Sequence, residues 1–420
     1  MSNQSKVQLH EENKVENLTL VAILAYQLTQ IIFNLISNGL FNNLGGDYLS
    51  FWSSGYIANT KGYSYVYDLN IQAGVQQMYT PTGEKFGVVP TPFFPIFIIP
   101  FQLMALFSPS VSFSLWTVIN LVLLFLYLKN RILTNFPGRY LLATMLTVPV
   151  FQNFYYGQVE VCLMIFISEF LIASRKGELF KSGIWLGLLL WKPQLLILIV
   201  PFLFIKKSWA TLTGFFTTSL FVFLSSLILI GVNGFIQIKN LWLDYSVGLP
   251  SNAPEVMMNW RMIGHHINEF ISPIAGGMVI ILGSIFTLFL CLRLMISHHQ
   301  TNYFPSQVVP LFGIFSATLA ITWHSHIHMA MILIPFLLML MQEEVLSVNL
   351  FKAWAVIPYV VYISIILILI LNILGILPEI NAIGGLIIGT CMLTFNLLFL
   401  YKAYELRNMD IASKSTLGTP

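Results

Sequence analysis

The segment LTLVAILAYQLTQIIFNLISNGL at residues 18–40 is followed almost at once by GGDYLSFW at residues 45–52. The first stretch has no charged residue and is long enough to cross about 30 Å of hydrocarbon as a helix. The second places one acid, Asp47, among aromatic residues directly after that helix. A carboxylate held just outside a bilayer is well placed to act as a general base on lipid-borne substrates.

The composition of the whole chain agrees with this beginning. Of its 420 residues, 57% are hydrophobic and 9% are charged, and the mean hydropathy is +0.79. A soluble core cannot bury so much apolar surface, so we expect a multi-span membrane protein. The net charge of +3 comes from basic residues that are typical topology signals, and we expect no nucleic-acid partner. The cysteines Cys162, Cys291 and Cys391 lie in apolar segments and show neither a disulfide framework nor metal-ligand spacing.

Apolar segments recur along the chain and predict an all-α polytopic protein with about 10–12 transmembrane or re-entrant helices and amphipathic helices in the first outer loop. The segments are 18–40, 88–107, 109–128, 138–156, 158–174, 182–205, 208–231, 272–296, 305–323, 326–342, 350–375 and 380–401. We divide the chain into a cytoplasmic segment 1–17, a membrane domain 18–407 with outer loops 41–87 and 232–271, and a cytoplasmic tail 408–420.

Two apolar segments are interrupted by proline, which removes a helix hydrogen bond and favours broken or re-entrant structure. Segment 88–107 carries four prolines, and segment 182–205 is broken at Lys192-Pro193. If neither segment crosses fully, both termini are cytoplasmic and the basic residues concentrate inside, as membrane proteins prefer. The basic residues left outside are Lys61, Lys85, Lys239 and Arg261. Lys192 then lies at the apex of a hairpin with arms of about 15 Å, near the outer face.

This topology places the informative polar residues at the extracytoplasmic face of a plasma membrane. Asp47 is either an ordinary loop acid or a base held near the lipid by the amphipathic stretch from Leu49 to Ile57. Lys192 is either a cation reaching for the interface or a ligand for an anionic phosphate, since intramembrane ionisable residues are functional by default. Gln158 and Glu160 begin a helix at the same face, where an anion would also be favoured.

The loop Met258-Asn259-Trp260-Arg261 offers a planar cation and an indole, with His265 close behind. Arginine suits bidentate contact with phosphate, and tryptophan suits stacking on a sugar. The alternative is that Arg261 pairs with a nearby acid (Asp244, Glu255 or Glu269) and only ties the loop down.

His324, His326 and His328 suggest a metal site, but their spacing turns His326 away from the other two on a helix, and no nearby acid completes a ligand set. We therefore expect no metal and no other cofactor. The better interpretation is a histidine that donates to a phosphate oxygen, and the alternative is a packed interfacial histidine.

These residues, taken together, resemble glycosyltransferase family 87, whose members are integral-membrane enzymes with the C-type glycosyltransferase fold. The resemblance extends from about residue 40 to about residue 340. It consists of Asp47, Tyr65-Val66-Tyr67-Asp68, the proline-rich Pro90–Pro95, Gly157-Gln158, Gly183 and Gly187 before Lys192-Pro193, Met258–Arg261, and His324-Ser325-His326, in this order. Two departures are Pro90-Thr91-Pro92 where the family often has Tyr-Pro-Pro, and a glycine displaced to Gly264.

The resemblance implies inverting transfer of a hexose, mannose above all, from a polyprenyl-phosphate donor to a lipid or glycan acceptor at the membrane, with Asp47 as the general base. The leaving phosphate would be bound by Lys192, Arg261 and His324. The sugar or acceptor would contact Tyr48, Trp52, Gln158, Glu160, Asn259, Trp260, His265 and His326. A transporter or lipid flippase, or a non-catalytic scaffold, is the alternative, although the sequence shows neither the repeats nor the midplane polar site of a transporter.

Overall fold

The computed structural model describes residues 3–37, 40–41, 44–80, 88–134, 136–247, 253–296, 304–374 and 383–416. Every regular element within these ranges is a helix, and the one isolated β-bridge there joins Met257 to His326. The prediction of an all-α polytopic membrane protein is confirmed. Lys85, one of the cations expected outside, is not among the described residues.

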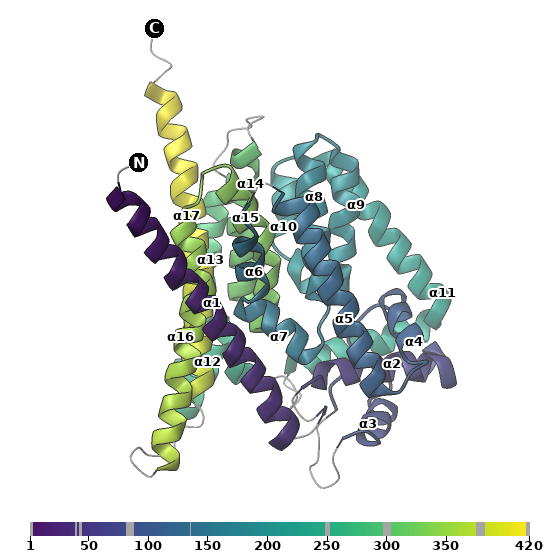
Figure 1. The fold of residues 1–420 in the computed structure, drawn as a ribbon. Coiled ribbons are helices and arrows are strands. Elements are labelled where there is room, and N and C mark those ends of the chain that lie inside the picture. Colours follow the sequence, from purple (N-terminus) through teal and green to yellow (C-terminus); the bar gives the residue numbers. More distant parts are fainter. Residues whose placement is uncertain are drawn as a thin grey trace.

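Six helices are long and apolar enough to cross a membrane, with suitable stretches of 21–35 residues within the described ranges. They are α1 (Asn3–Ser37), α5 (Pro109–Tyr127), α11 (Trp209–Val247), α13 (Pro273–Ile296), α16 (Val348–Ile373) and α17 (Ile383–Thr416). The chain enters along α1 and leaves along α17 at the same end of the bundle (Figure 1). We call this the terminal end, and α17 extends the chain as a helix through residues 408–416.

Shorter helices complete the bundle and form its core. They are α6 (Gly138–Met145), α7 (Val148–Tyr156), α8 (Glu160–Arg175), α9 (Leu179–Gly187), α10 (Ile199–Ile205), α12 (Trp260–Phe270), α14 (Phe304–Ile321) and α15 (Ile334–Gln342). The segment from Ile327 through Leu340 is almost completely excluded from solvent. This central position explains why it is apolar on every side.

The break at Lys192-Pro193 makes a hairpin of the 179–205 segment. Lys192 has an extended backbone (φ −130°, ψ 82°) between two short 3₁₀ turns, so the helical path of α9 ends there and α10 returns. Gly183 packs on the start of α11, where an added Cβ would lie 1.9 Å from the carbonyl oxygen of Thr211. Because α11 follows α10 directly and also packs on α9, the ends of the two arms away from Lys192 lie close together.

The other proline-rich segment also fails to form a long helix. Residues 88–94 are irregular, and only Pro95–Met104 is helical, ending in α4 (Ile99–Met104). Helix α4 packs closely on α2 (Gly46–Thr60), since a Cβ on Gly55 would come 2.2 Å from the carbonyl oxygen of Phe101.

The prediction that Leu49–Ile57 is an amphipathic stretch with a lipid-facing side is wrong. Helix α2 is buried on nearly all sides, including the polar Ser50, Ser53 and Ser54. It is covered by α4 and by α3 (Leu69–Gln77), so its apolar residues pack against protein instead of lipid. Helix α3 begins at Asp68, whose carboxylate accepts hydrogen bonds from the backbone amides of Asn70 and Ile71 as a helix N-cap.

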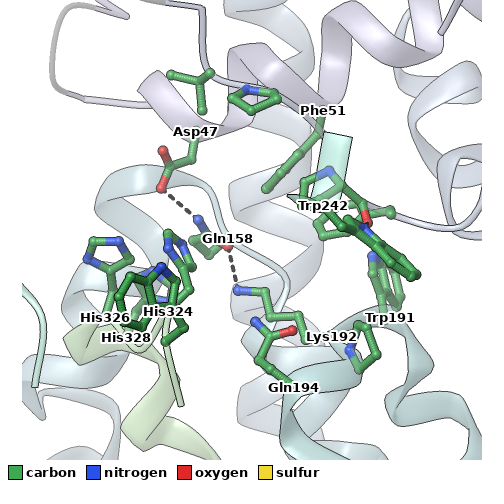
Figure 2. A pocket seen from close by; sticks show the side chains of 16 residues that line it. Asp47, Phe51, Gln158, Trp191, Lys192, Gln194, Trp242, His324, His326 and His328 are labelled. Atoms are coloured by element: carbon green, nitrogen blue, oxygen red, sulfur yellow. Dashed lines mark hydrogen bonds between the residues drawn. The ribbon is translucent and has the colours of Figure 1, made fainter. Parts of the chain in front are cut away.

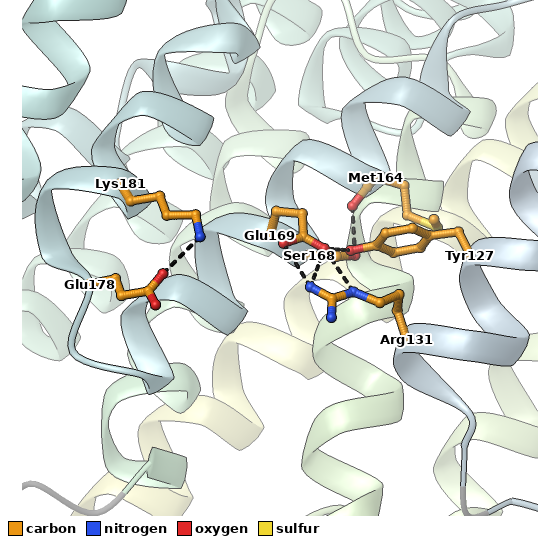
Figure 3. Close-up of polar contacts among 7 residues, drawn as sticks. All are labelled: Tyr127, Arg131, Met164, Ser168, Glu169, Glu178 and Lys181. Atoms are coloured by element: carbon orange, nitrogen blue, oxygen red, sulfur yellow. Dashed lines mark hydrogen bonds and ion pairs between the residues drawn. The ribbon is translucent and has the colours of Figure 1, made fainter.

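Ion pairs tie helices together near the terminal end, away from α2. Arg131, in the π-helical turn that ends α5, forms a bidentate pair with Glu169 of α8 at 2.9 and 3.1 Å, and Tyr127 donates to the same carboxylate at 2.8 Å (Figure 3). Glu178 and Lys181 form a second pair at 2.9 Å at the start of α9.

Candidate functional site

A cavity of about 280 Å³ lies where α2, the 88–94 segment, the Lys192 turn and the 323–328 segment meet. Figure 2 shows three histidines on one side of it, Trp191 and Trp242 on the other, and Gln158 with Lys192 between them. The lining residues are Asp47, Phe51, Val89, Pro90, Pro92, Phe93, Gln158, Trp191, Lys192, Pro193, Gln194, Trp242, Trp323, His324, His326 and His328.

Asp47 extends into this cavity from the first turn of α2. Gly45 precedes the helix with a left-handed backbone (φ 76°), which lets the chain turn sharply between the first span and α2. An acid in the first turn also interacts favourably with the helix dipole. Asp47 is half-buried, and burial raises the pKa of its carboxyl group, although His328, the hydrogen bond from Gln158, and Lys192 act in the opposite direction. A carboxylate of raised basicity facing a cavity is a candidate general base.

Gln158 holds one oxygen of that carboxylate. Its Nε2 donates to Oδ2 of Asp47 at 2.6 Å, and its Oε1 accepts from Nζ of Lys192 at 3.0 Å. Gly157 (φ 71°) turns the chain between α7 and Gln158 and packs on Tyr48, where a Cβ would lie 2.5 Å from the Tyr48 Cβ. The glycine therefore permits the close approach that brings Gln158 to Asp47.

Lys192 also bonds directly to Glu160, the first residue of α8. Oε1 of Glu160 lies 3.0 Å from Nδ1 of His328 as well. Glu160 is completely buried, and its backbone amide donates to Oδ1 of Asn153 at 3.0 Å. The result is a continuous polar chain, Asp47–Gln158–Lys192–Glu160–His328, which we call the relay. Charges this deeply buried need such partners, because desolvation otherwise outweighs their attraction.

The three histidines form one wall of the cavity. The ring centroids of His324 and His326 are 4.6 Å apart, and those of His326 and His328 are 5.8 Å apart. Burial, together with Lys192, lowers the pKa of His324 to about 3, and burial also holds the pKa of His326 well below its usual value. Both rings are therefore neutral hydrogen-bonding groups at physiological pH. No group of three histidine, cysteine or acidic side chains in the described ranges is arranged to hold a metal ion.

Arg261 does not line the cavity itself, but it contacts Trp323, which does. Its guanidinium lies 4.1 Å from the centre of the Trp323 ring, and Nη1 donates to the Trp323 backbone oxygen at 3.1 Å. The 257–259 and 323–328 segments are joined by the Met257–His326 bridge and by the amide of Met258, which donates to the Ser325 oxygen at 2.9 Å. These contacts tie Arg261 and its loop to the 323–328 segment.

Six of the eight residues expected to bind sugar or acceptor, Glu160 among them, lie outside the cavity lining. The other five make contacts elsewhere: Tyr48 bonds to Ser112, Trp52 donates to the Phe107 oxygen at 3.1 Å, Asn259 caps α12, Trp260 donates to Thr287 at 2.9 Å, and His265 lies 3.3 Å from Glu269. Glu160 reaches the cavity only through Lys192. The site residues predicted from the sequence that line it directly are Asp47, Gln158, Lys192, His324 and His326.

The aromatic wall was not expected from the sequence. Trp191 stacks on Phe97 with ring centroids 5.1 Å apart, and Trp242 donates from its indole to the Pro92 oxygen at 2.9 Å. The sequence marks Trp191 only by its position next to Lys192. Trp242 has no local signal, because its hydrogen-bond partner Pro92 is 150 residues away. Together with Phe93 they provide flat apolar surfaces suited to a sugar ring or a lipid chain.

Residues 91–261 match the model of glycosyltransferase family 87. The matched region contains Thr91–Pro95, Gln158, Glu160, Lys192 and Arg261, and over these residues the resemblance seen in the sequence is confirmed. Asp47 and the histidines of the 323–328 segment lie outside the matched residues. No curated protein and no solved structure matches the chain. The family match, with the six apolar helices, supports a membrane glycosyltransferase.

Proposed function

We propose that this protein transfers a hexose from a polyprenyl-phosphate donor to a lipid or glycan acceptor. The starting point is the match of residues 91–261 to glycosyltransferase family 87. Mannose is the first sugar to test, and the extracytoplasmic face of the plasma membrane is the expected location. The observation that supports the proposal most is Asp47, a carboxylate of raised pKa that faces a 280 Å³ cavity at the end of the bundle opposite the termini.

Asp47 would act as the general base. Gln158 occupies Oδ2, and within the described residues Oδ1 has no hydrogen-bond partner. Oδ1 would take the proton of an acceptor hydroxyl as the hydroxyl oxygen bonds to the anomeric carbon. The bond from that carbon to the phosphate oxygen breaks, and its electron pair leaves with the polyprenyl phosphate. A single displacement of this kind inverts the anomeric configuration.

The departing phosphate gains negative charge and needs donors that are already oriented. Arg261 supplies a planar cation behind Trp323, and the neutral ring of His324 can donate through an N–H group. Lys192 lines the same cavity, but Glu160 already shares its charge. We therefore assign Lys192 a double task, which is to orient Gln158 and to contribute part of its positive charge to the phosphate.

The sugar would lie between the histidine wall and the aromatic wall. Trp323 is 46% exposed and Trp191 and Trp242 border the same cavity, so they replace Trp52 and Trp260 as the proposed stacking partners. The prolines of the 88–94 segment close one side without adding backbone N–H donors there.

The test is transfer of radiolabelled mannose from polyprenyl-phosphate mannose in membranes that contain the wild-type protein, Asp47→Asn or Asp47→Glu at equal abundance. We expect wild-type-dependent product, with loss of at least a hundredfold in Asp47→Asn. Sealed vesicles of both orientations would locate the reaction, and the anomeric configuration of the product would report inversion.

Equal product with Asp47→Asn would remove Asp47 from the mechanism. No product with any protein, for mannose and for other polyprenyl-linked hexoses, would contradict the glycosyltransferase proposal and favour movement of a lipid-linked sugar across the membrane. That second activity can be followed in the same vesicles by protection of the labelled lipid from an added reagent.

A further inference from the structure

A second cavity lies far from the relay, near the terminal end of the bundle. It has a volume of about 190 Å³ and is enclosed by α1, α6 and α16. Its lining residues are Val15, Glu16, Thr19, Leu20, Ile23, Arg139, Tyr140, Ala143, Phe351, Lys352, Ala355 and Val356. We call it the α1 groove.

The groove exists because α1 stands partly apart from the bundle. Only 17% of its apolar stretch is buried, against 28–44% for the other five long helices. Deeper in the bundle, α1 is joined by Gln27, which donates to the Leu146 oxygen at 3.0 Å and to the Tyr359 hydroxyl at 2.5 Å. Towards the terminal end the helices diverge, and small side chains such as Ala143 and Ala355 leave the space unfilled.

The polar groups of the groove are gathered at one end. Oε1 of Glu16 lies 2.5 Å from Nζ of Lys352, and Oε2 lies 3.2 Å from Nη1 of Arg139. The side chains of Lys352 and Arg139 remain 46% and 40% exposed. Among the described residues that line the groove, two cations face one carboxylate, and both cations stay partly exposed beside it. Thr19, which lines the α1 side of the groove, donates its hydroxyl to the backbone oxygen of Val15 at 2.9 Å.

The groove is short enough to lie within one leaflet of a bilayer. From Glu16 to Ile23, the last residue of α1 that lines it, the helix rises about 10 Å, which is less than half of a hydrocarbon core about 30 Å thick. Both bordering helices, α1 and α16, are candidate membrane spans, and Val15 at the edge is 61% exposed. The open side of the groove therefore faces lipid, with its cations at the depth of the phosphate groups.

We propose that the α1 groove binds one anionic glycerophospholipid of the bilayer, with an acyl chain between α1 and α16 and the phosphate at Arg139 and Lys352. Arginine and lysine at the end of an apolar groove between spans are suited to an anionic headgroup. This site is separate from the donor site, and it does not depend on the proposed glycosyl transfer.

The test is native mass spectrometry of the full-length protein titrated with phosphatidylglycerol or phosphatidylcholine. The variants are Arg139→Gln/Lys352→Gln, which removes the two cations, and Ala143→Phe/Ala355→Phe, which fills the groove without a change in charge. The control is Lys129→Gln/Lys402→Gln, which removes two cations outside the groove, one exposed and one half-buried and paired with Glu405.

We expect the wild-type protein and the control to retain one phosphatidylglycerol that phosphatidylcholine does not replace. The charge variant should bind it at least tenfold more weakly, since each cation near the surface contributes about 1 kcal/mol, and the filled variant should lose it. Equal retention of both lipids by the wild-type protein, or unchanged retention in both groove variants, would overturn the proposal. So would a change of oligomeric state in the filled variant, because the groove would then be a contact between copies.

Discussion

Gln158 donates from Nε2 to Oδ2 of Asp47 at 2.6 Å, across 111 residues of sequence. The direction of this bond is determined by Lys192 on the other side of the amide. An ammonium group can only donate, so the amide oxygen of Gln158 must face Lys192 and its NH₂ group must face Asp47. The lysine thus determines which end of the amide meets the carboxylate.

Replacing Gln158 with alanine should lower kcat about tenfold to a hundredfold with little change in KM for the donor. Asp47 would keep its charge but lose the bond that orients it, and small displacements of a reacting group cost this much. The measurement is initial transfer rate against donor concentration. Gln152→Ala is the matched control, since that glutamine bonds to Tyr362 at 2.6 Å and lies outside the cavity. A Gln158→Ala enzyme with wild-type kcat would show that Asp47 needs no such support.

The pH dependence of transfer should report the state of Asp47. A general base works above its pKa, so activity should fall as the pH drops through that value. Burial raises the pKa of Asp47, and this acidic limb should accordingly lie above the range of an ordinary aspartate. Lys192 acts to lower the pKa, so Lys192→Met should move the limb to higher pH, whereas Lys192→Arg should leave it near its original position. A limb that stays in place in Lys192→Met would separate Asp47 from the relay.

Removal of only one charge from the relay should destabilise the protein. Lys192→Met leaves the buried carboxylate of Glu160 without its cation, and breaking a buried pair in this way typically costs about 3–5 kcal/mol. The melting temperature of the purified protein should fall clearly in Lys192→Met and recover in Lys192→Met/Glu160→Gln. Lys129→Met, at an exposed position, serves as the control. Equal melting of the single and double variants would mean that the pair adds no coupling energy.

The sequence was a good guide wherever a residue is costly in a membrane. An isolated lysine before a proline predicts the break at Lys192, and Asp47 stands out because few acids occur near it. Partners could not be predicted in the same way. Glu160 reaches Lys192 across 32 residues, and nothing local distinguishes it from an ordinary helix-starting acid. Tyr48 and Trp52 follow Asp47 closely in the sequence. Successive residues of a helix point about 100° apart, so these two side chains point away from Asp47 and are buried in the packed interior.

Transfer should not require a divalent metal. No second acid adjoins Asp47 in the sequence, and the proposed phosphate donors are Arg261, His324 and Lys192. We expect the initial rate to be unchanged after chelator treatment and dialysis, and unchanged again when magnesium or manganese is added. Loss of activity with the chelator and recovery with either ion would refute metal independence and require ligands beyond those identified for the phosphate.

The hairpin that carries Lys192 depends on close helix packing at glycine. A Cβ on Gly183 would lie 1.9 Å from the Thr211 oxygen and 2.7 Å from the Phe215 nitrogen, both of them backbone atoms of α11 that cannot rotate away. Gly183→Ala should therefore separate α9 from α11 and lower the free energy of unfolding by about 1–3 kcal/mol, as is typical of overpacking. The melting temperature should fall accordingly, and transfer should be reduced because Lys192 is displaced.

Gly277→Ala in α13 is the control for this substitution, because a Cβ there meets no atom within 4 Å and alanine favours a helix. It should melt at or slightly above the wild-type temperature and keep full activity. If Gly183→Ala behaved like Gly277→Ala in both measurements, the contact between α9 and α11 would be more adaptable than its geometry indicates. The ammonium group of Lys192 would then have to be held by Glu160 and Gln158, which are its side-chain hydrogen-bond partners in the described structure.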